Sequence, residues 1–231
     1  MKPKRQPDEI KGGKQMKSKA ELIVISSTKF GENSIVLHTL SREYGRRGFL
    51  VRVSPKTAMA LFLPLNILEA EVTENPKSEL WFARNFTCVS PLNSVRSNIY
   101  KNTMTLFMSE VLFRVVRDQT CEDCLADWLK GQILTLDALQ GDYSNFHLLF
   151  LLGLCTALGF SPGMEDLSPF VGEWYTSVEA LLTRPFEEAM LVPLNGAGRN
   201  EIAESILRYI AHHTESSVNV RSLAVLRDIF A

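Results

Sequence analysis

The chain has 231 residues, 45% of them hydrophobic, and a formal net charge of −1. This length and composition suit one large or two small soluble domains, and they exclude a uniformly basic protein. The charge is nevertheless uneven along the chain. Residues 1–19 carry seven Lys or Arg against two Asp or Glu, whereas residues 88–231 carry ten against seventeen.

The first 19 residues are expected to form a disordered leader. Residues 1–15 combine Lys, Arg, Pro and Gly without apolar periodicity, a composition that does not support a packed core. A basic arm that touches nucleic acid is the alternative interpretation. No apolar signal core precedes Ala20, and the most apolar stretch, residues 146–160, is shorter than the roughly 20 residues of a membrane span. The sequence therefore favours a cytoplasmic protein without a membrane partner.

Five segments with a period of two follow the leader. They cover residues 21–27, 34–40, 46–53, 67–73 and 80–87 and are separated by turn-rich stretches. Five short strands within about seventy residues are typical of an OB-type barrel. An SH3-like barrel or a small sandwich would leave a similar pattern. We therefore expect an OB-fold nucleic-acid-binding domain over residues 20–88.

The apolar spacing becomes helical after Ser90 and Pro91. Residues 92–116 place their apolar side chains three and four positions apart, which predicts one helix with a wide apolar face. Further helices are expected near residues 122–139, 145–160, 174–182, 199–214 and 222–230. The sequence thus predicts an α+β protein in which a five-stranded OB-fold β-barrel precedes an α-helical domain over residues 89–231.

The motifs of common enzyme classes are absent from the sequence. There is no Gly-rich phosphate loop with its Lys, no G-x-S-x-G turn and no H-E-x-x-H pair,. Cys121 and Cys124 have the spacing of half a zinc site or of a redox pair, but the other two cysteines are isolated. His38 and His147 lie in apolar runs, where a packed or surface imidazole is the usual explanation. We predict no catalytic residues, no cofactor and no metal ion.

A local basic patch lies within the predicted barrel. The segment 29–56 carries six cations against two glutamates, and guanidinium groups pair with phosphate oxygens without reading base identity. A solvated barrel edge, whose charges prevent aggregation, is the alternative. The candidate nucleic-acid-binding residues are Lys29, Arg42, Arg46, Arg47, Arg52 and Lys56, all of which except Arg47 could converge on one rim, with Tyr44 and Phe49 as weaker candidates for base stacking.

Three segments resemble one protein family. The stretch "KFGENSIVLHTLSREYGR", the helix "FHLLFLLGLCTALGFSP" and the C-terminal "LRYIAHHTESSVNVRSLAVLRDIF" occur in that order. They are similar to the signatures of the bacterial recombination mediator RecO. Many members carry a zinc-binding cysteine cluster beyond the second segment, but residues 162–194 contain no cysteine. The resemblance therefore implies an OB barrel with a helical domain, and zinc is expected to be absent there.

The resemblance also implies a function. A RecO-like protein would bind single- and double-stranded DNA, anneal complementary strands, engage the C-terminal tail of single-stranded DNA-binding protein, and help RecR load RecA. Arg114 and Arg117 on the first long helix would form the basic edge of the tail-binding groove. Two other classes stay open: a protein-binding adaptor without DNA affinity, and a metal-dependent nucleic-acid enzyme.

Overall fold

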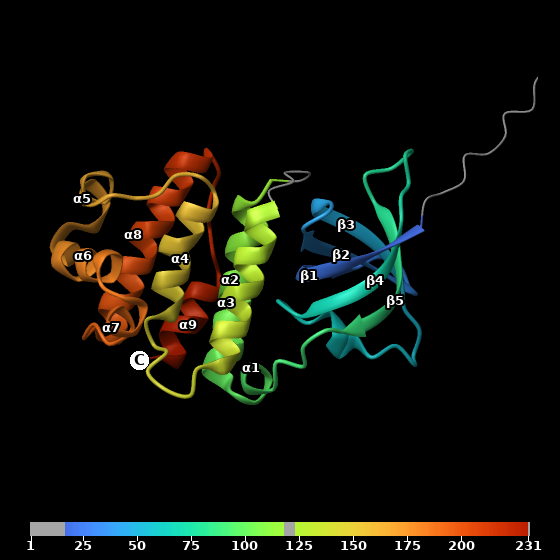
Figure 1. Ribbon diagram of the computed structural model, residues 1–231, viewed down its shortest axis with the longest axis horizontal. Helices are drawn as coiled ribbons and strands as arrows, with labels where there is room; N and C mark the ends of the chain where they lie inside the picture. Colours follow the sequence, from blue (N-terminus) through green and yellow to red (C-terminus); the bar gives the residue numbers. More distant parts are fainter. Residues whose placement is uncertain (1–16, 118–122, 231) are drawn as a thin grey trace, which may run out of the picture.

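The computed structural model describes residues 17–117 and 123–230. A β-barrel lies at one end of the molecule and a bundle of helices at the other, as Figure 1 shows. Most of the predicted leader, residues 1–16, and Cys121 lie outside the described residues. The predicted boundary between leader and barrel, after residue 19, is too late, because the first strand already begins at Lys17.

The barrel consists of five strands that close on themselves in the order β1-β2-β3-β5-β4. All neighbouring strands are antiparallel except β3 and β5. These two pair in parallel, with Phe49 opposite Trp81 and Leu50 opposite Phe82. This topology confirms the predicted OB-fold barrel,. The strands are β1 (Lys17–Lys29), β2 (Ser34–Ser41), β3 (Gly45–Arg52), β4 (Ile67–Thr73) and β5 (Trp81–Cys88), and a short 3-10 helix, η1 (Met59–Phe62), follows β3.

The helical domain also follows the predicted order, with two additions. Its α-helices are α1 (Asn93–Ser97), α2 (Ile99–Val115), α3 (Asp123–Ala138), α4 (Phe146–Ala157), α5 (Met164–Val171), α6 (Tyr175–Thr183), α7 (Phe186–Met190), α8 (Gly196–Thr214) and α9 (Ser222–Ile229), with the 3-10 turn η2 (Gly172–Trp174) before α6. The sequence analysis missed α5, which contains Pro169, and α7, which has only five residues and is too short to repeat an apolar pattern,. No described helix is long and apolar enough to cross a membrane.

The helix predicted over residues 92–116 is two helices. Asn98 has an extended backbone, with φ −108° and ψ 118°, and its side chain accepts hydrogen bonds from the amides of Tyr100 and Lys101. It is therefore the N-cap of α2 and ends α1. The apolar pattern continues across this break, which is why periodicity alone did not show it.

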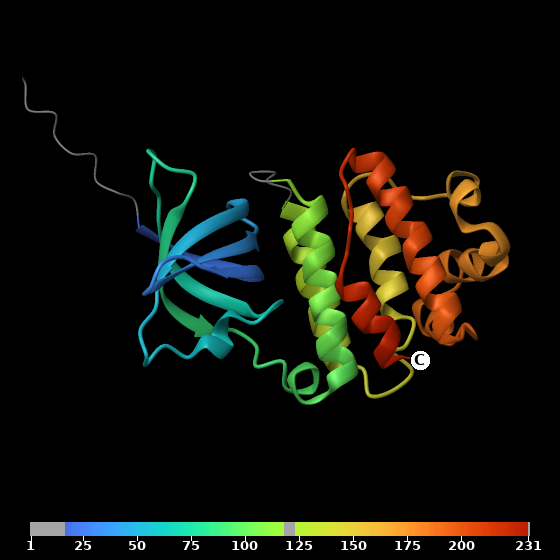
Figure 2. The same ribbon diagram turned by 180° about the vertical axis from the view of Figure 1, so that it is seen from behind.

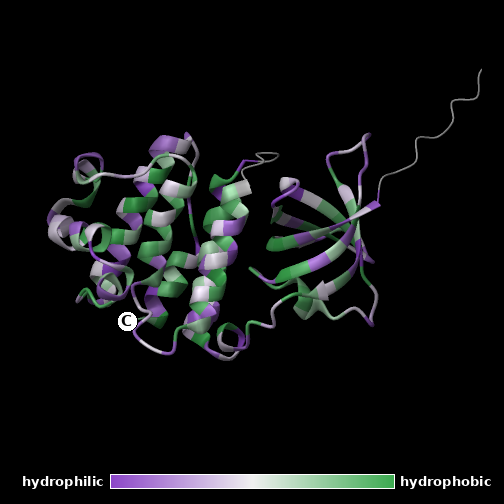
Figure 3. Cartoon of the chain, viewed as in Figure 1, coloured by the Kyte–Doolittle hydropathy of each residue, from purple (hydrophilic) through white to green (hydrophobic). Residues whose placement is uncertain are grey.

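One hydrophobic core extends from the helices into the outer face of the barrel. Ile23, Ile25 and Leu40 belong to the same buried cluster as the helical core, whereas the barrel interior forms a second cluster. Strands β1 and β2 are consequently covered on both faces over part of their length. Figure 3 shows hydrophobic residues on both the strands and the helices, and a hydrophilic loop between β4 and β5.

Candidate nucleic-acid interface

The β2–β3 hairpin separates the predicted basic residues into two groups. Its register places Arg46 opposite Leu40 near the turn and Arg52 opposite Ser34 at the other end. Six residues of extended strand cover about 20 Å. The expectation that Lys29, Arg42, Arg46, Arg52 and Lys56 converge on one rim is therefore wrong.

Arg46 lies between the barrel and the helical domain. Its side chain points outward from β3, where α2 covers it, and only 9% of the residue is exposed. The guanidinium donates to the carbonyl of Phe113 at 2.9 Å and to the carbonyl of Val116, and it sits 4.6 Å from the Phe113 ring. Arg46 thus joins the end of α2 to the barrel, and the prediction that it contacts phosphate is wrong.

The aromatic residues near the hairpin turn are packed into the barrel. Phe49 is fully buried, so its predicted role in base stacking is wrong. The half-buried Tyr44 hydroxyl lies 2.7 Å from Ser18 Oγ, and its ring meets Trp81 edge-on at 5.1 Å. The half-buried Arg47 places its guanidinium 4.2 Å from the Trp81 ring. Tyr44 and Arg47 therefore help to close this end of the barrel.

Arg42 is exposed but faces the helical domain. Its Nη1 lies 3.5 Å from a carboxylate oxygen of Asp127 on α3. Because this carboxylate offsets the charge locally, Arg42 offers less positive potential than the sequence suggested.

Lys29 and Arg52 lie at the opposite end of the barrel, and Lys56 follows in the loop after β3. Lys29, Arg52 and Lys56 are exposed, and none of them forms a salt bridge with a described acidic residue. Lys29 ends β1 and Arg52 ends β3, with β2 between them, so their backbones lie about 10 Å apart. Backbone hydrogen bonds from Phe30 N to Ser34 O and from Val53 N to Asn33 O hold this end together. We call Lys29, Phe30, Arg52 and Lys56 the hairpin rim.

Two further aromatic residues of the barrel are exposed, and only Phe82 was missed by the sequence analysis. Phe30 is 55% exposed within the hairpin rim, and Phe82 is 42% exposed on β5. Phe82 pairs with Leu50 on β3, two residues from Arg52 on the same outward face,. The strand pattern contained the signal for Phe82, since Trp81 and Ala83 alternate with it and pack against the barrel interior.

The cysteines do not assemble a described metal site. No group of three or more His, Cys, Asp or Glu that would hold an ion occurs within residues 17–117 and 123–230. Burial raises the pKa of the Cys155 thiol to about 12, so this sulfur stays protonated. Cys88 and Cys124 are exposed and not disulfide-bonded.

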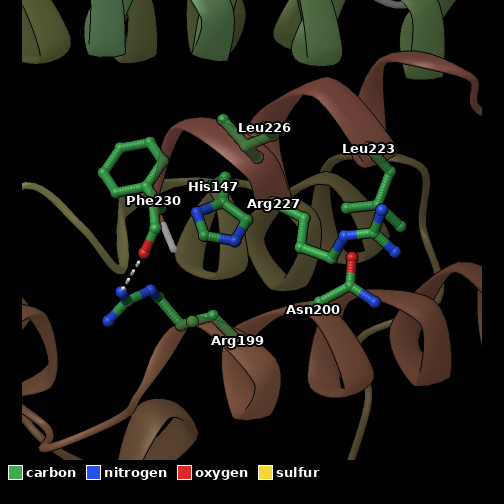
Figure 4. Close-up of a pocket in the computed structure, with 8 residues that line it drawn as sticks. His147, Arg199, Asn200, Leu223, Leu226, Arg227 and Phe230 are labelled. Carbon is green, nitrogen blue, oxygen red and sulfur yellow. Dashed lines mark hydrogen bonds between the residues drawn. The ribbon is translucent and has the colours of Figure 1, made fainter.

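His147 is a core histidine in the helical domain. The sequence analysis had allowed either a packed or a surface imidazole at this position. The residue is 2% exposed, and Figure 4 shows its ring beside Phe230 and Arg199 in a small pocket. Burial lowers its pKa to about 3, and the charge of Arg199 adds to this effect. The Arg199 guanidinium is itself held by the carbonyls of Leu194, at 2.5 Å, and Phe230, at 3.4 Å. The imidazole therefore stays neutral at ordinary pH.

The two arginines predicted to edge a partner groove lie at the end of α2. Arg114 Nη2 is 4.0 Å from Glu110 Oε1, and Arg117 Nη2 donates to the Thr214 carbonyl at 3.1 Å. Both residues are exposed. Arg117 therefore lies beside the end of α8.

The barrel and the helical domain together define an OB-fold protein. The exposed cations and aromatic residues of its hairpin rim suit an extended polyanion. The family model for the N-terminal domain of recombination protein O matches residues 16–92. A DNA repair protein RecO from Bacteroides fragilis is 30% identical over 184 residues, which cover 77% of this chain and 75% of the relative. The chain therefore belongs to the RecO family, whose function is in DNA repair and recombination.

Two further relatives match over nearly their whole length. The RecO protein of Phocaeicola vulgatus is 27% identical over 90% of this chain and 97% of its own. The RecO protein of Flavobacterium johnsoniae is 27% identical over 94% of this chain and 100% of its own. Barrel and helical domain therefore occur together in these relatives.

Proposed function

We propose that this chain is a non-catalytic DNA-binding recombination mediator whose hairpin rim holds phosphates. The observation that carries the proposal is the group of three exposed cations, Lys29, Arg52 and Lys56, beside the exposed ring of Phe30. Cations bind the backbone of any sequence, and an aromatic face stacks on any base. Such a surface would accept both single- and double-stranded DNA and would leave bases free to anneal.

The proposal is tested by the salt dependence of DNA binding. The double substitution Arg52→Ala with Lys56→Ala should weaken binding of unrelated single-stranded sequences alike, because phosphate contacts carry no base information. Each lost contact should make the log–log salt slope shallower by ~0.7, or ~1.4 for the pair. Fluorescence anisotropy with labelled oligonucleotides at several salt concentrations measures both quantities.

A matched control removes the same charge elsewhere. Arg184, which follows α6, and Arg227 on α9 are exposed, and replacing both by Ala should leave affinity and slope nearly unchanged. If both double variants lose affinity equally, overall charge and not the hairpin rim governs binding. A wild-type protein without affinity at low salt would favour the adaptor, and divalent-metal-dependent cleavage would favour the enzyme.

We propose two protein partners. One is RecR, with which the chain would help to load RecA, and the other is the C-terminal tail of single-stranded DNA-binding protein. The exposed Arg114 and Arg117 side chains support an acidic tail as ligand,. Calorimetry with a peptide that ends in Asp and Phe residues should show binding at low salt, and Arg114→Ala with Arg117→Ala should weaken it. Unchanged binding by this variant would remove both arginines from the site.

A further inference from the structure

A row of apolar side chains crosses the outer face of the barrel. Val36 on β2 pairs with Leu50 on β3, and Leu50 pairs with Phe82 on β5. Their neighbours along the strands, such as Phe49 and Trp81, pack into the barrel interior, so these three side chains point outward,. None of the three belongs to either hydrophobic cluster of the described residues. We call Val36, Leu50 and Phe82 the apolar row.

The contact between the two domains does not account for the apolar row. Figure 2 shows the helices on one side of the barrel, and the barrel residues that join the helical core include Ile23, Ile25 and Leu40 but no member of the row. Phe82 is 42% exposed. The outward face of an antiparallel strand is usually polar where it meets water, and apolar side chains gathered beside charged ones indicate a binding surface.

The apolar row lies beside a cation of the hairpin rim. Arg52 follows Leu50 by two residues on the same outward face of β3, and it is exposed,. One strand spacing and two residues of rise place the backbones of Arg52 and Phe82 about 8 Å apart. A nucleotide whose phosphate pairs with the Arg52 guanidinium can therefore place its base on the Phe82 ring.

We propose that Phe82 stacks on an unpaired base and makes the protein bind single-stranded DNA more tightly than duplex DNA. This inference rests on the proposed function, because the hairpin rim must hold the strand. The bases of a duplex are paired and stacked on each other, so that one of them reaches Phe82 only after it has left the stack. The bases of a single strand are free to turn towards the ring. The rim cations hold both kinds of DNA, whereas Phe82 adds affinity for one of them.

The substitution Phe82→Ala separates these two contributions. It should weaken binding of a labelled single strand about tenfold, because one stacked base is lost. Binding of a duplex of the same sequence should change by less than about twofold, because the phosphate contacts remain. Phe82→Leu keeps an apolar side chain without a ring and should behave like the Ala variant, whereas Phe82→Trp should bind as the wild type does. Fluorescence anisotropy with both oligonucleotides measures these affinities.

Tyr175 on α6 supplies a matched control, because it is also 42% exposed but lies on the helical domain. Tyr175→Ala should leave both affinities unchanged, and Arg52→Ala with Lys56→Ala should weaken both. If Phe82→Ala bound both DNAs as the wild type does, or lost affinity for both equally, the inference about Phe82 would fail while the hairpin rim remained. A wild-type protein that binds neither DNA would contradict the proposed function itself.

A photochemical experiment locates the stacked base directly. Under ultraviolet light, 5-iodouracil in a single strand crosslinks to an aromatic ring that stacks on it, and mass spectrometry of the digested complex identifies the residue. We expect the crosslink at Phe82. A crosslink at Phe30 alone would place the stacked base at the hairpin rim and overturn the inference. Dimerisation of the wild type that Phe82→Ala abolishes, with DNA binding unchanged, would overturn it as well.

Discussion

Arg46 and Arg52 lie on the same strand and on the same outward face, yet they have opposite roles. Arg46 is covered by α2 and donates to its terminal carbonyls, whereas Arg52 lies beyond the helices and is exposed. A strand pattern predicts the face of a side chain, but it does not predict which part of that face another domain covers. We therefore expect substitution of Arg46 to change mainly the stability of the protein, and substitution of Arg52 to change mainly its binding of DNA.

Replacing Arg46 by Met should destabilise the protein by about 2 kcal/mol, because two carbonyls lose a charged donor in a buried position. The control Arg52→Met should change the free energy of unfolding by less than about 0.5 kcal/mol. Urea unfolding of both variants measures the difference. If Arg46→Met left stability unchanged but abolished DNA binding, Arg46 would belong to the DNA site after all.

His147 should make stability depend on pH. Its pKa is lowered to about 3 in the folded protein, whereas an unfolded His titrates near ~6.5. The unfolded state then binds more protons between these values, so stability is fully present above pH ~6.5 and falls as the pH falls towards 3. At pH ~5 the loss from this residue should be roughly 2 kcal/mol.

The variant His147→Phe isolates this effect, because its ring suits the neighbouring Phe107 and Phe230 rings. Urea unfolding at pH ~7 and ~5 should show a smaller loss for the variant than for the wild type. An equal loss in both proteins would mean that carboxylates alone govern stability in this range.

At the scale of elements, Asn98 marks the division between α1 and α2. Its Oδ1 accepts from Tyr100 N at 2.9 Å and from Lys101 N at 3.2 Å, while its Nδ2 donates to the Tyr143 hydroxyl at 2.8 Å. One side chain therefore begins α2 and connects its start to the loop before α4. A single polar side chain thus separates two helices although the apolar pattern continues across the break.

Asn98→Ala should cost about 1–2 kcal/mol of stability, because it removes both the cap and the bond to Tyr143. Tyr143→Phe removes only the second bond and should cost less. Asn98→Asp keeps a capping oxygen and should retain most of the stability. Thermal unfolding followed by circular dichroism compares the three variants, and an Asp variant as unstable as the Ala variant would argue against capping.

At the scale of the whole molecule, barrel and helical domain are joined by polar bonds as well as by a shared core. Arg96 Nη2 donates to Pro64 O at 2.7 Å and to Asn66 Oδ1 at 2.6 Å, and Lys130 Nζ lies 2.6 Å from Glu21 Oε2. Both contacts connect the helical domain to the barrel. The two predicted domains thus form one packed body.

The protein should consequently unfold in one cooperative transition. Hydrogen exchange of β1 and of α2 should reach the same global free energy, because separating them would expose Ile23, Ile25 and Leu40 to water,. Mass spectrometry over a denaturant series measures both segments in the same sample. If β1 lost protection at a lower denaturant concentration than α2, the barrel would be an independent unit.

The sequence by itself determined the strands, the order of the longer helices and the change from a period of two to a helical period. These features follow from local alternation of side chains, which the chain carries in its residue order. It also indicated Lys29, Arg52 and Lys56 as exposed cations, and the structure leaves all three exposed.

Only the tertiary structure decided which parts of the barrel surface remain free. Arg46 became an interdomain contact because the end of α2 lies against its side chain, and Phe49 became core because its side of the strand faces the barrel interior. The division of the cations between two ends follows from strand register, which is set by pairing between strands,. Register and domain packing depend on contacts between residues far apart in the chain, so local pattern could not determine them.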